Sequence, residues 1–410
     1  MTTLSGTEVL SLSSLSLTCV GIIANTFHGD GEPLIASLAL SGIAFSFAYS
    51  LIRWLGGVFM AAGLKGKDMS KVRKIEMWLA SYLSALLSLQ SATLLGIADD
   101  LFDIRWRHKF FIPAISSIPM LVVYFVDFGV TRVVVPRPLV PFLNNLELVD
   151  LGWLYYVYMA AIAIFCPNSI NILAGINGIE VSQSLVIAFL LLINDSLYLS
   201  PWIRGSEHIH PATDSHLFSI YLLLPFIGVS LALWTHNWYP ARVFVGDTYC
   251  YFAGMVFAVV GILGHFSKTL LLLFIPQIFN FVYSAPQLLR LVPCPRHRLP
   301  KFNARTGLLE PSVTEWKYPS SPIVARLLHL LHKLHLLRVR TNEEGQITES
   351  TNFTLLNLWL VWFGPLREDW LAIQILLMQT ACGLMGLVIR HKLALWVFRE
   401  DNRSGIGLPV

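Results

Sequence analysis

Long apolar stretches alternate with short polar loops along the chain. Stretches long enough, or nearly long enough, to cross a bilayer lie at about 9–27, 34–53, 77–98, 110–126, 152–168, 180–200, 216–235, 248–265, 269–292 and 371–394. A helix needs about 20 mainly apolar residues to cross a hydrocarbon core that is about 30 Å thick. The pattern therefore predicts an all-α polytopic membrane protein, a bundle of about ten transmembrane helices.

One large polar region interrupts this pattern between the last two predicted spans. The chain is predicted to divide into a helical membrane bundle at 1–292, a cytosolic loop domain at 293–355, and a C-terminal membrane segment and tail at 356–410. The loop contains PIVARLLHLLHKLHLL at 322–337, which is apolar at helical spacing with basic residues between. Two interpretations stay open for this helix: it lies on the membrane surface, or it packs on the loop's own small core.

Composition supports the membrane class and excludes two others. The 410 residues are 55% hydrophobic and 13% charged, and the mean hydropathy is +0.62. The net charge of +4 is too small to indicate a nucleic-acid partner, and the Lys and Arg residues cluster in short loops, as they do on the cytosolic side of membrane proteins. The five cysteines are scattered singly, which argues against a disulfide scaffold or a redox site.

Adjacent acids end the span at 77–98. In GIADDLFDIRWRHKFF at 96–111, Asp99 and Asp100 come last in the apolar run, and four basic residues follow by Lys109. Ionisable groups at a bilayer boundary are costly to dehydrate, and acids at a helix C-terminus oppose the helix dipole. Although a frayed helix end in solvent is the alternative, the pattern favours a functional pair that faces a phosphate or a metal.

Amide side chains gather in FCPNSINILAGINGIE at 165–180. Pro167 interrupts the helix, Asn168 and Asn171 lie three residues apart, and Asn177 stands between two glycines. Amide oxygens suit a hard cation such as Mg²⁺, while amide and backbone N–H groups suit a uracil edge or phosphate oxygens. Asparagines that cap a broken membrane helix explain the motif equally well, so this motif alone does not decide between the two.

A third motif precedes the span at 248–265. In HNWYPARVFVGDTYCYF at 236–252, Phe244 stands just before Gly246 and Asp247. An acid here can be a helix cap, but a helix N-terminus also attracts phosphate and its metal. Two basic loops complete the set: GLKGKDMSKVRK at 63–74 and PCPRHR at 293–298. Arginine pairs offer forked donors to a pyrophosphate, and basic residues that only set membrane topology are the alternative.

Together these motifs resemble a known family. GIADD, RWRHK, NSINILAGINGIE, RVFVGDT, YFAGMVFAVVGILGHFSK and PCPRHR occur in the order seen in the polyprenyl-phosphate hexosamine-phosphate transferases of glycosyltransferase family 4. The resemblance runs from about residue 34 onward and is strongest to the eukaryotic, fungal-like branch, which uses UDP-N-acetylglucosamine and dolichyl phosphate. It implies a multi-pass enzyme of the endoplasmic reticulum membrane with a cytosol-facing site, a need for Mg²⁺ and inhibition by tunicamycin. It also implies a possible homodimer.

The activity that this resemblance implies is the first step of N-glycan precursor synthesis. UMP would be released and dolichyl-diphosphate-N-acetylglucosamine formed. By position, the resemblance places Mg²⁺ on Asn171 and Asp247 and the catalytic acids on Asp99 and Asp100. Further contacts to the substrates fall on Lys67, Asp68, Met69, Trp106, Lys109, Asn168, Asn177, Phe244, Arg296, His297 and Arg298. The groove for the lipid phosphate falls on Ile164, Phe165, Cys166, Pro167, Ser169, Ile170 and Ile172.

The chain departs from the family after its first basic loop. The family continues that loop with an I-P-E-S or I-P-E-T motif and a further span, whereas here Glu76 leads straight into WLASYLSALLSLQ. The loops at 63–74 and 105–109 are both basic and should both face the cytosol, yet one predicted span separates them. A family span is therefore predicted to be missing after Glu76.

Two further classes of function stay in view. A catalytically impaired scaffold of the same family would follow from the missing span. A nucleotide-sugar or lipid transporter is less favoured, because transporters place polar residues at mid-membrane in paired repeats, whereas these motifs lie at span ends.

Overall fold

The computed structural model describes residues 5–27, 39, 43, 46, 70–102, 104, 109–143, 146–199, 212–295, 297–316 and 320–398. The chain forms two compact units, residues 1–77 and 78–410, which are described separately. In the first, the apolar helix α1 (Gly6–Phe27) confirms the helix predicted at 9–27. The predicted span at 34–53 lies outside the described residues except for 39, 43 and 46.

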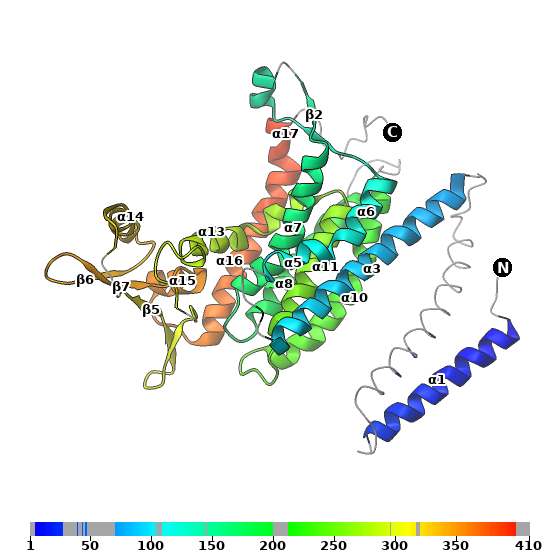
Figure 1. Ribbon diagram of the computed structural model, residues 1–410, viewed down its shortest axis with the longest axis horizontal. Helices are drawn as coiled ribbons and strands as arrows, with labels where there is room; N and C mark the ends of the chain where they lie inside the picture. The colour runs from blue at the N-terminus through cyan, green and yellow to red at the C-terminus, as the bar shows by residue number, and fades with distance from the viewer. Residues whose placement is uncertain are drawn as a thin grey trace. The chain divides into compact units, whose positions relative to one another are not determined.

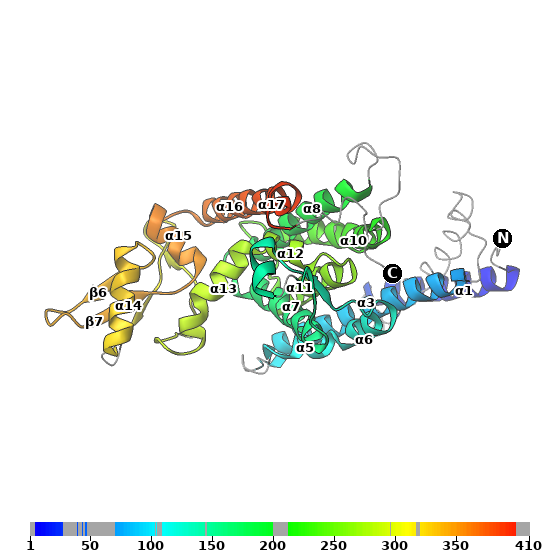
Figure 2. The same cartoon turned by 90° about the horizontal axis from the view of Figure 1, so that it is seen from above.

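Long apolar helices build the second unit (Figures 1 and 2). They are α3 (Ser70–Phe102) from residue 78 onward, α7 (Trp153–Ile172), α8 (Ile179–Leu199), α10 (Thr213–Asn237), α11 (Gly246–Leu263) and α16 (Glu368–Val388). Over the described part of the whole chain, seven helices are long and apolar enough to cross a membrane, and an eighth span arises if one bent pair counts as one. The protein is thus a polytopic membrane protein, while ten spans remain a prediction.

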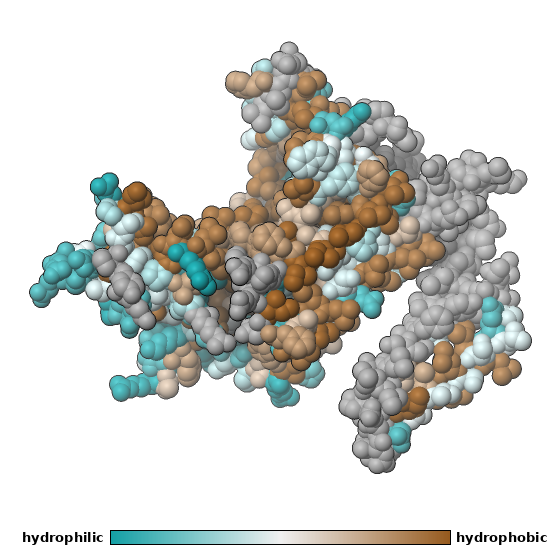
Figure 3. Space-filling view, viewed as in Figure 1, coloured by the Kyte–Doolittle hydropathy of each residue, from teal (hydrophilic) through white to brown (hydrophobic). Residues whose placement is uncertain are grey.

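Helix α11 forms the centre of this unit. Its residues Met255, Phe257 and Val260 are completely buried, and it packs against α7, α10 and α12. A helix that is apolar all round belongs in an interior. By contrast, apolar side chains such as Phe125 and Leu224 are exposed on the outside of the bundle, and Figure 3 shows hydrophobic residues over much of its visible face. Such a surface is suited to lipid.

Two predicted spans are broken by proline. Residues 110–126 form the short helices α5 (Ile112–Ser116) and α6 (Ile118–Asp127), each with a proline in its first turn, and neither alone is long enough to cross a membrane. Residues 269–292 form α12 (Ser267–Leu273) and α13 (Ile275–Leu288), which meet at 72°. Pro276 lacks the N–H that would continue the helical hydrogen bonds, which accounts for the break.

Short strands correct the all-α expectation. Strand β1 (Arg132–Val134) pairs antiparallel with β2 (Leu148–Asp150), and the short helix η1 (Arg137–Leu143) lies between them in sequence. In the polar region, β3 (Lys301–Asn303) pairs with β4 (Leu308–Glu310). A three-stranded antiparallel sheet has the order β5 (Val313–Glu315), β7 (Ile347–Thr351), β6 (Val339–Thr341).

Helix α14 (Pro322–Lys333) has features of both interpretations given above. Leu328 is buried in a small core with Val292 and Phe353, so the helix packs on the loop's own core. Ile323, Leu327 and Leu330 remain exposed, at 79%, 48% and 52%, so an apolar face is also left over. The remaining elements are α15 (Leu355–Phe363), the π-helical turn η2 (Ile389–Leu393) and α17 (Ala394–Val397).

Candidate functional site

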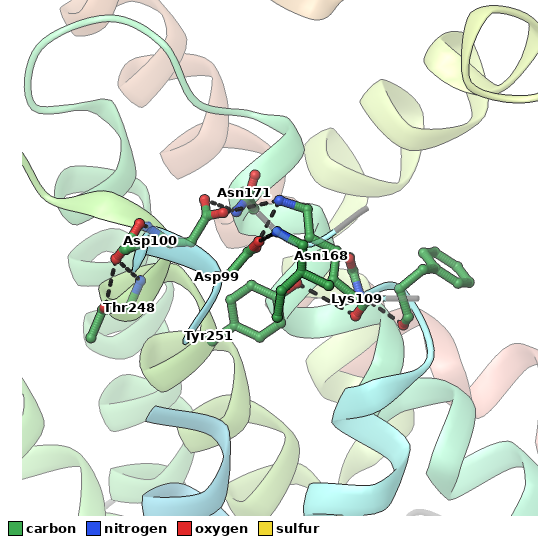
Figure 4. Close-up of polar contacts among 10 residues, drawn as sticks. Asp99, Asp100, Lys109, Asn168, Asn171, Thr248 and Tyr251 are labelled. Atoms are coloured by element: carbon green, nitrogen blue, oxygen red, sulfur yellow. Dashed lines mark hydrogen bonds and ion pairs between the residues drawn. The ribbon is translucent and has the colours of Figure 1, made fainter. Parts of the chain in front are cut away.

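Polar side chains from three helix ends meet at one place in the bundle (Figure 4). Asp99 and Asp100 come from the last turns of α3, Asn168 and Asn171 from the last turns of α7, and Asp247 with Thr248 from the first turn of α11. Lys109 follows α3. The structure therefore brings together the motifs at 96–111, 165–180 and 236–252, which the sequence analysis selected separately.

Lys109 joins two carboxylates. Its ammonium nitrogen lies 2.7 Å from Asp99 Oδ2 and 3.0 Å from Asp247 Oδ2, and the Asp99 side chain is almost fully buried. Burial alone would lower the pKa of Lys109, but the hydrogen bonds and charges of Asp99 and Asp247 outweigh it and raise that pKa. Lys109 is therefore a fixed positive charge between the ends of α3 and α11.

Asp100 has a different role from Asp99. Its two carboxylate oxygens accept hydrogen bonds from the backbone N–H groups of Asp247 and Thr248, at 2.8 and 3.0 Å, and from the Thr248 hydroxyl at 2.6 Å. These N–H groups have no partner within α11 because they lie in its first turn. Asp100 thus caps α11 from a neighbouring helix, a role usually taken by the residue just before a helix.

Gly96 explains how Asp100 reaches α11. The two residues are four apart in α3 and share one face of the helix. A Cβ atom at Gly96 would lie 2.5 Å from Thr248 Cα, so only glycine lets the two backbones approach this closely. Gly96 and Asp100 of the GIADD motif therefore both contact the start of α11.

We expect Asp100→Ala to destabilise the protein by about 0.5–2 kcal/mol, the usual range for loss of a helix N-cap. The reason is that two backbone N–H groups and one hydroxyl lose their acceptor. Thermal unfolding of the purified variant in detergent measures the change. Asp150→Ala is the matched control, since Asp150 accepts from Gly152 N–H in an exposed hairpin. An unfolding temperature that falls no further than in the control contradicts the capping role.

The end of α7 contributes two asparagines with different contacts. The Asn171 amide nitrogen donates a short hydrogen bond to Asp247 Oδ1. Asn168 is buried, and its amide nitrogen donates to the carbonyls of Ile164 at 2.8 Å and Phe110 at 3.2 Å. Because Phe110 follows Lys109 directly, Asn168 holds the backbone that presents this lysine. Asn171 thus contacts the carboxylate of Asp247, whereas Asn168 contacts only backbone carbonyls.

The turn after α7 is held by two glutamates that the sequence analysis did not select. The N–H of Gly175 donates to Glu180 at 3.0 Å, and the N–H of Asn177 donates to Glu368 at 2.7 Å. Glu180 ends the NILAGINGIE string, so its position was a usable signal. Glu368 opens α16, 191 residues after Asn177, and nothing local in the sequence connects the two.

The PCPRHR loop packs against the same turn. A Cβ atom at Gly175 would lie 1.9 Å from the Leu299 side chain, so the residue after Arg298 touches the turn. Asn357 of α15 donates to the Arg298 carbonyl at 2.8 Å and fixes the loop. Burial lowers the pKa of Arg298, and its Nη1 atom is buried without a hydrogen-bond partner in the described part of the chain. Such a donor suits an anion.

The remaining predicted site residues have three different outcomes. Phe244 is 89% exposed just before α11, His297 is exposed and Asn177 is half-buried. Within the predicted lipid groove, Ile164, Phe165 and Ile172 are partly exposed, whereas the others are buried in the bundle and offer no surface to a lipid in this conformation, namely Cys166, Pro167, Ser169 and Ile170. Five predicted residues lie outside the described part of the chain: Lys67, Asp68, Met69, Trp106 and Arg296.

Comparisons with known proteins identify the family. The family model described as glycosyl transferase family 4 matches residues 82–265, a range that contains the acids and asparagines of the cluster. The chain is 59% identical over 325 residues to the UDP-N-acetylglucosamine–dolichyl-phosphate N-acetylglucosaminephosphotransferase of Saccharomyces cerevisiae, covering 79% of this chain and 71% of that one. Proteins of the same name from Schizosaccharomyces pombe and Dictyostelium discoideum are 48% and 45% identical, covering 90% and 76% of this chain and 95% and 69% of theirs.

The S. pombe alignment is longer than this chain. It runs over 429 positions, more than the 410 residues of this chain, and so includes positions at which this chain has no residue. A missing internal segment would produce such positions. The identities and coverage leave no doubt about the relationship itself. The chain belongs to glycosyl transferase family 4.

Proposed function

We propose that this membrane protein transfers N-acetylglucosamine phosphate from UDP-N-acetylglucosamine to dolichyl phosphate. The products are dolichyl-diphosphate-N-acetylglucosamine and UMP, the first step towards the N-glycan precursor. Relatives from yeast to Dictyostelium are named for this activity, and their similarity covers most of this chain. The observation that carries the proposal is the convergence of Asp99, Lys109 and Asp247 with Asn171, because it collects charges of both signs where a phosphate transfer needs them.

The reaction brings two anions together. An oxygen of dolichyl phosphate attacks the β-phosphorus of the nucleotide sugar, the bond from that phosphorus to the oxygen of the α-phosphate breaks, and UMP leaves with the electron pair. Catalysis of such a step is mainly positioning and charge stabilisation. Lys109 supplies a fixed positive charge, and Arg298 offers a buried donor that lacks a partner among the described residues.

The acids favour direct transfer over a covalent aspartyl-phosphate. A phosphate monoester has a second pKa of about 6, so dolichyl phosphate is mostly dianionic at neutral pH and needs little help from a base. Both oxygens of Asp100 bind the start of α11. Those of Asp99 contact Lys109 and the backbone N–H of Ile104. Carboxylates held in this way are better suited to orienting groups than to attacking phosphorus.

Mg²⁺ is part of the proposal. Asn171 and Asp247 would hold the ion, and their direct contact is the supporting observation, since both can offer hard oxygen ligands at one point once the Asn171 amide turns over. No group of three or more His, Cys, Asp or Glu suited to a metal occurs among the described residues, so substrate phosphates and water would complete the shell. When bound, the ion would neutralise charge on the diphosphate.

The proposal also includes the contacts to the nucleotide sugar and the location of the protein. Phe244, which is exposed just before α11, would stack on the uracil, and Asn177 would also contact the nucleotide. Arg296, His297 and Arg298 would contact the pyrophosphate and sugar. The first basic loop would contact the nucleotide through Lys67, Asp68 and Met69. We place the protein in the endoplasmic reticulum membrane with this site facing the cytosol, and a homodimer remains part of the proposal.

Product analysis tests the function. The purified chain is incubated with UDP-N-acetylglucosamine, dolichyl phosphate and Mg²⁺, and both UMP and the lipid product are measured. The proposal requires the two products in equal amounts. A transporter would move substrate without forming either product, and a non-catalytic scaffold would also form neither. This one assay therefore distinguishes a transferase from both alternatives.

Restoring the family span after Glu76 should raise turnover. The loops at 63–74 and 105–109 are both basic, and one predicted span between them cannot return the chain to the same side of the membrane. Turnover of the 410-residue chain is compared with that of a version that carries the S. pombe segment at this position. Equal, robust turnover of both proteins would show that the segment is dispensable and that the predicted topology is wrong.

A further inference from the structure

Three buried glutamines form a chain across the bundle. Gln183 belongs to α8, Gln277 to α13 and Gln379 to α16, and each is at most 1% exposed. The amide nitrogen of Gln277 donates to the side-chain oxygens of both others, at 3.0 Å to Gln183 and 2.8 Å to Gln379. Amides are costly to bury in a membrane bundle, so this arrangement calls for a reason.

The two outer glutamines, Gln183 and Gln379, donate to backbone carbonyls where helices end or bend. Gln183 donates to the carbonyls of Leu173 at 2.8 Å and Ile170 at 3.2 Å, which flank Asn171 at the end of α7. Gln379 donates to the carbonyl of Leu273 at 2.8 Å, where α12 bends into α13. Carbonyls in the last turn of a helix have no N–H partner in their own helix, so the glutamines supply the missing donors.

The orientation of all three glutamine side-chain amides is fixed by their partners. Backbone carbonyls only accept hydrogen bonds, so Gln183 and Gln379 must turn their nitrogens outward and their oxygens towards Gln277. Gln277 must then donate both of its protons. Its own oxygen is buried with no hydrogen-bond partner among the described residues. An unsatisfied buried acceptor is destabilising, so this row of glutamines is not optimised for stability alone.

We infer that Gln183, oriented by Gln277 and Gln379, is a positioning residue that fixes Asn171 against Asp247. The last turn of α7 needs such support, since Pro167 removes one helical hydrogen bond and the glycine-containing turn at 175–178 follows directly. This inference rests on the proposed function, because it concerns how that site is held. It adds buried residues from α8, α13 and α16, which act through the end of α7.

Hydrogen exchange of the substrate-free protein gives the first test. In Gln183→Met and Gln277→Met, the amides of residues 170–176 should exchange at least about tenfold faster, since an opening made easier by 1.4 kcal/mol gives that factor. Asn194→Leu is the matched control. Asn194 is a buried amide near the other end of α8, bonded to Asp195 and His391, and its loss should leave 170–176 unchanged.

Kinetics give the second test. The Mg²⁺ concentration for half-maximal turnover should rise by about 10- to 100-fold in both methionine variants, the usual effect of removing a group that orients a metal ligand. The double variant should show no larger rise in this Mg²⁺ concentration than either single variant, because both substitutions interrupt the same row of glutamines. Gln183→Glu should recover part of the loss, because a neutral buried carboxyl group can still donate one hydrogen bond.

The outcomes separate this inference from the proposed function. Unchanged exchange of 170–176 in Gln183→Met overturns the inference. So does faster exchange with wild-type Mg²⁺ dependence, which would make the glutamines a stability feature only. If the wild-type chain forms no product, the proposed function fails, while the exchange comparison still decides whether these glutamines hold the end of α7.

Discussion

Asp247→Asn is expected to reduce turnover by about 10³-fold, the scale on which single groups that stabilise charge in phosphoryl transfer act. The substitution keeps the shape of the side chain and removes its charge. Lys109 then keeps only the carboxylate of Asp99, and Asn171 loses the charged partner with which it would hold Mg²⁺. Release of UMP from UDP-N-acetylglucosamine, measured over a range of Mg²⁺ concentrations, shows the effect.

Asp150→Asn is the control for this change. Asp150 is an exposed acid of the β1–β2 hairpin that bonds Thr131 and the N–H of Gly152, so it carries the same substitution away from the cluster. It should leave turnover unchanged. Turnover of Asp247→Asn within about tenfold of the wild type would remove Asp247 from the catalytic centre, since tenfold corresponds to only about 1.4 kcal/mol of transition-state stabilisation.

Lys109→Met is expected to cost about 10²- to 10³-fold in turnover, comparable to the loss of a donor that stabilises a developing oxyanion. It should also lower the unfolding temperature, because Asp99 and Asp247 would face each other without the ammonium between them. Combining Lys109→Met with Asp99→Asn removes that repulsion. The double variant should regain stability but not turnover, which separates charge balance from catalysis.

Two comparisons decide this second prediction. Lys333→Met changes an exposed lysine at the end of α14 and should behave as the wild type. Lys109→Arg keeps the positive charge with a different donor geometry, so it should retain more turnover than Lys109→Met and less than the wild type. Full activity of Lys109→Met would show that the charge of Lys109 plays no part in the reaction.

The sequence could predict which motifs matter but not how their residues divide the work. The sequence predicts a role for Asp99 and Asp100 as one acidic pair. Adjacent residues in a helix point about 100° apart, so they face different neighbours. Asp99 meets Lys109, whereas Asp100 caps α11, whose first residues lie 147 positions further along the chain. Which helix packs on which face of α3 is a property of the whole fold, and no local pattern encodes it.

Prolines in the sequence mark the breaks in the helices. The buried glutamines that support the site are only partly predictable from the sequence. Pro113 and Pro119 fall inside the apolar run at 110–126, and Pro276 falls inside the run at 269–292, so both breaks could be predicted from proline alone. A glutamine such as Gln183 within an apolar span is conspicuous in the sequence. Its partner Gln277 is 94 residues away, and only packing identifies it.

The central claim is that the β-phosphorus of the nucleotide sugar moves to the lipid. UDP-N-acetylglucosamine labelled with ³²P at the β position is incubated with the purified chain, dolichyl phosphate and Mg²⁺, and the lipid and nucleotide fractions are separated. The account predicts that the label enters the lipid fraction in the same amount as unlabelled UMP appears. Label that stays with the nucleotide, or is released as free phosphate, would contradict it.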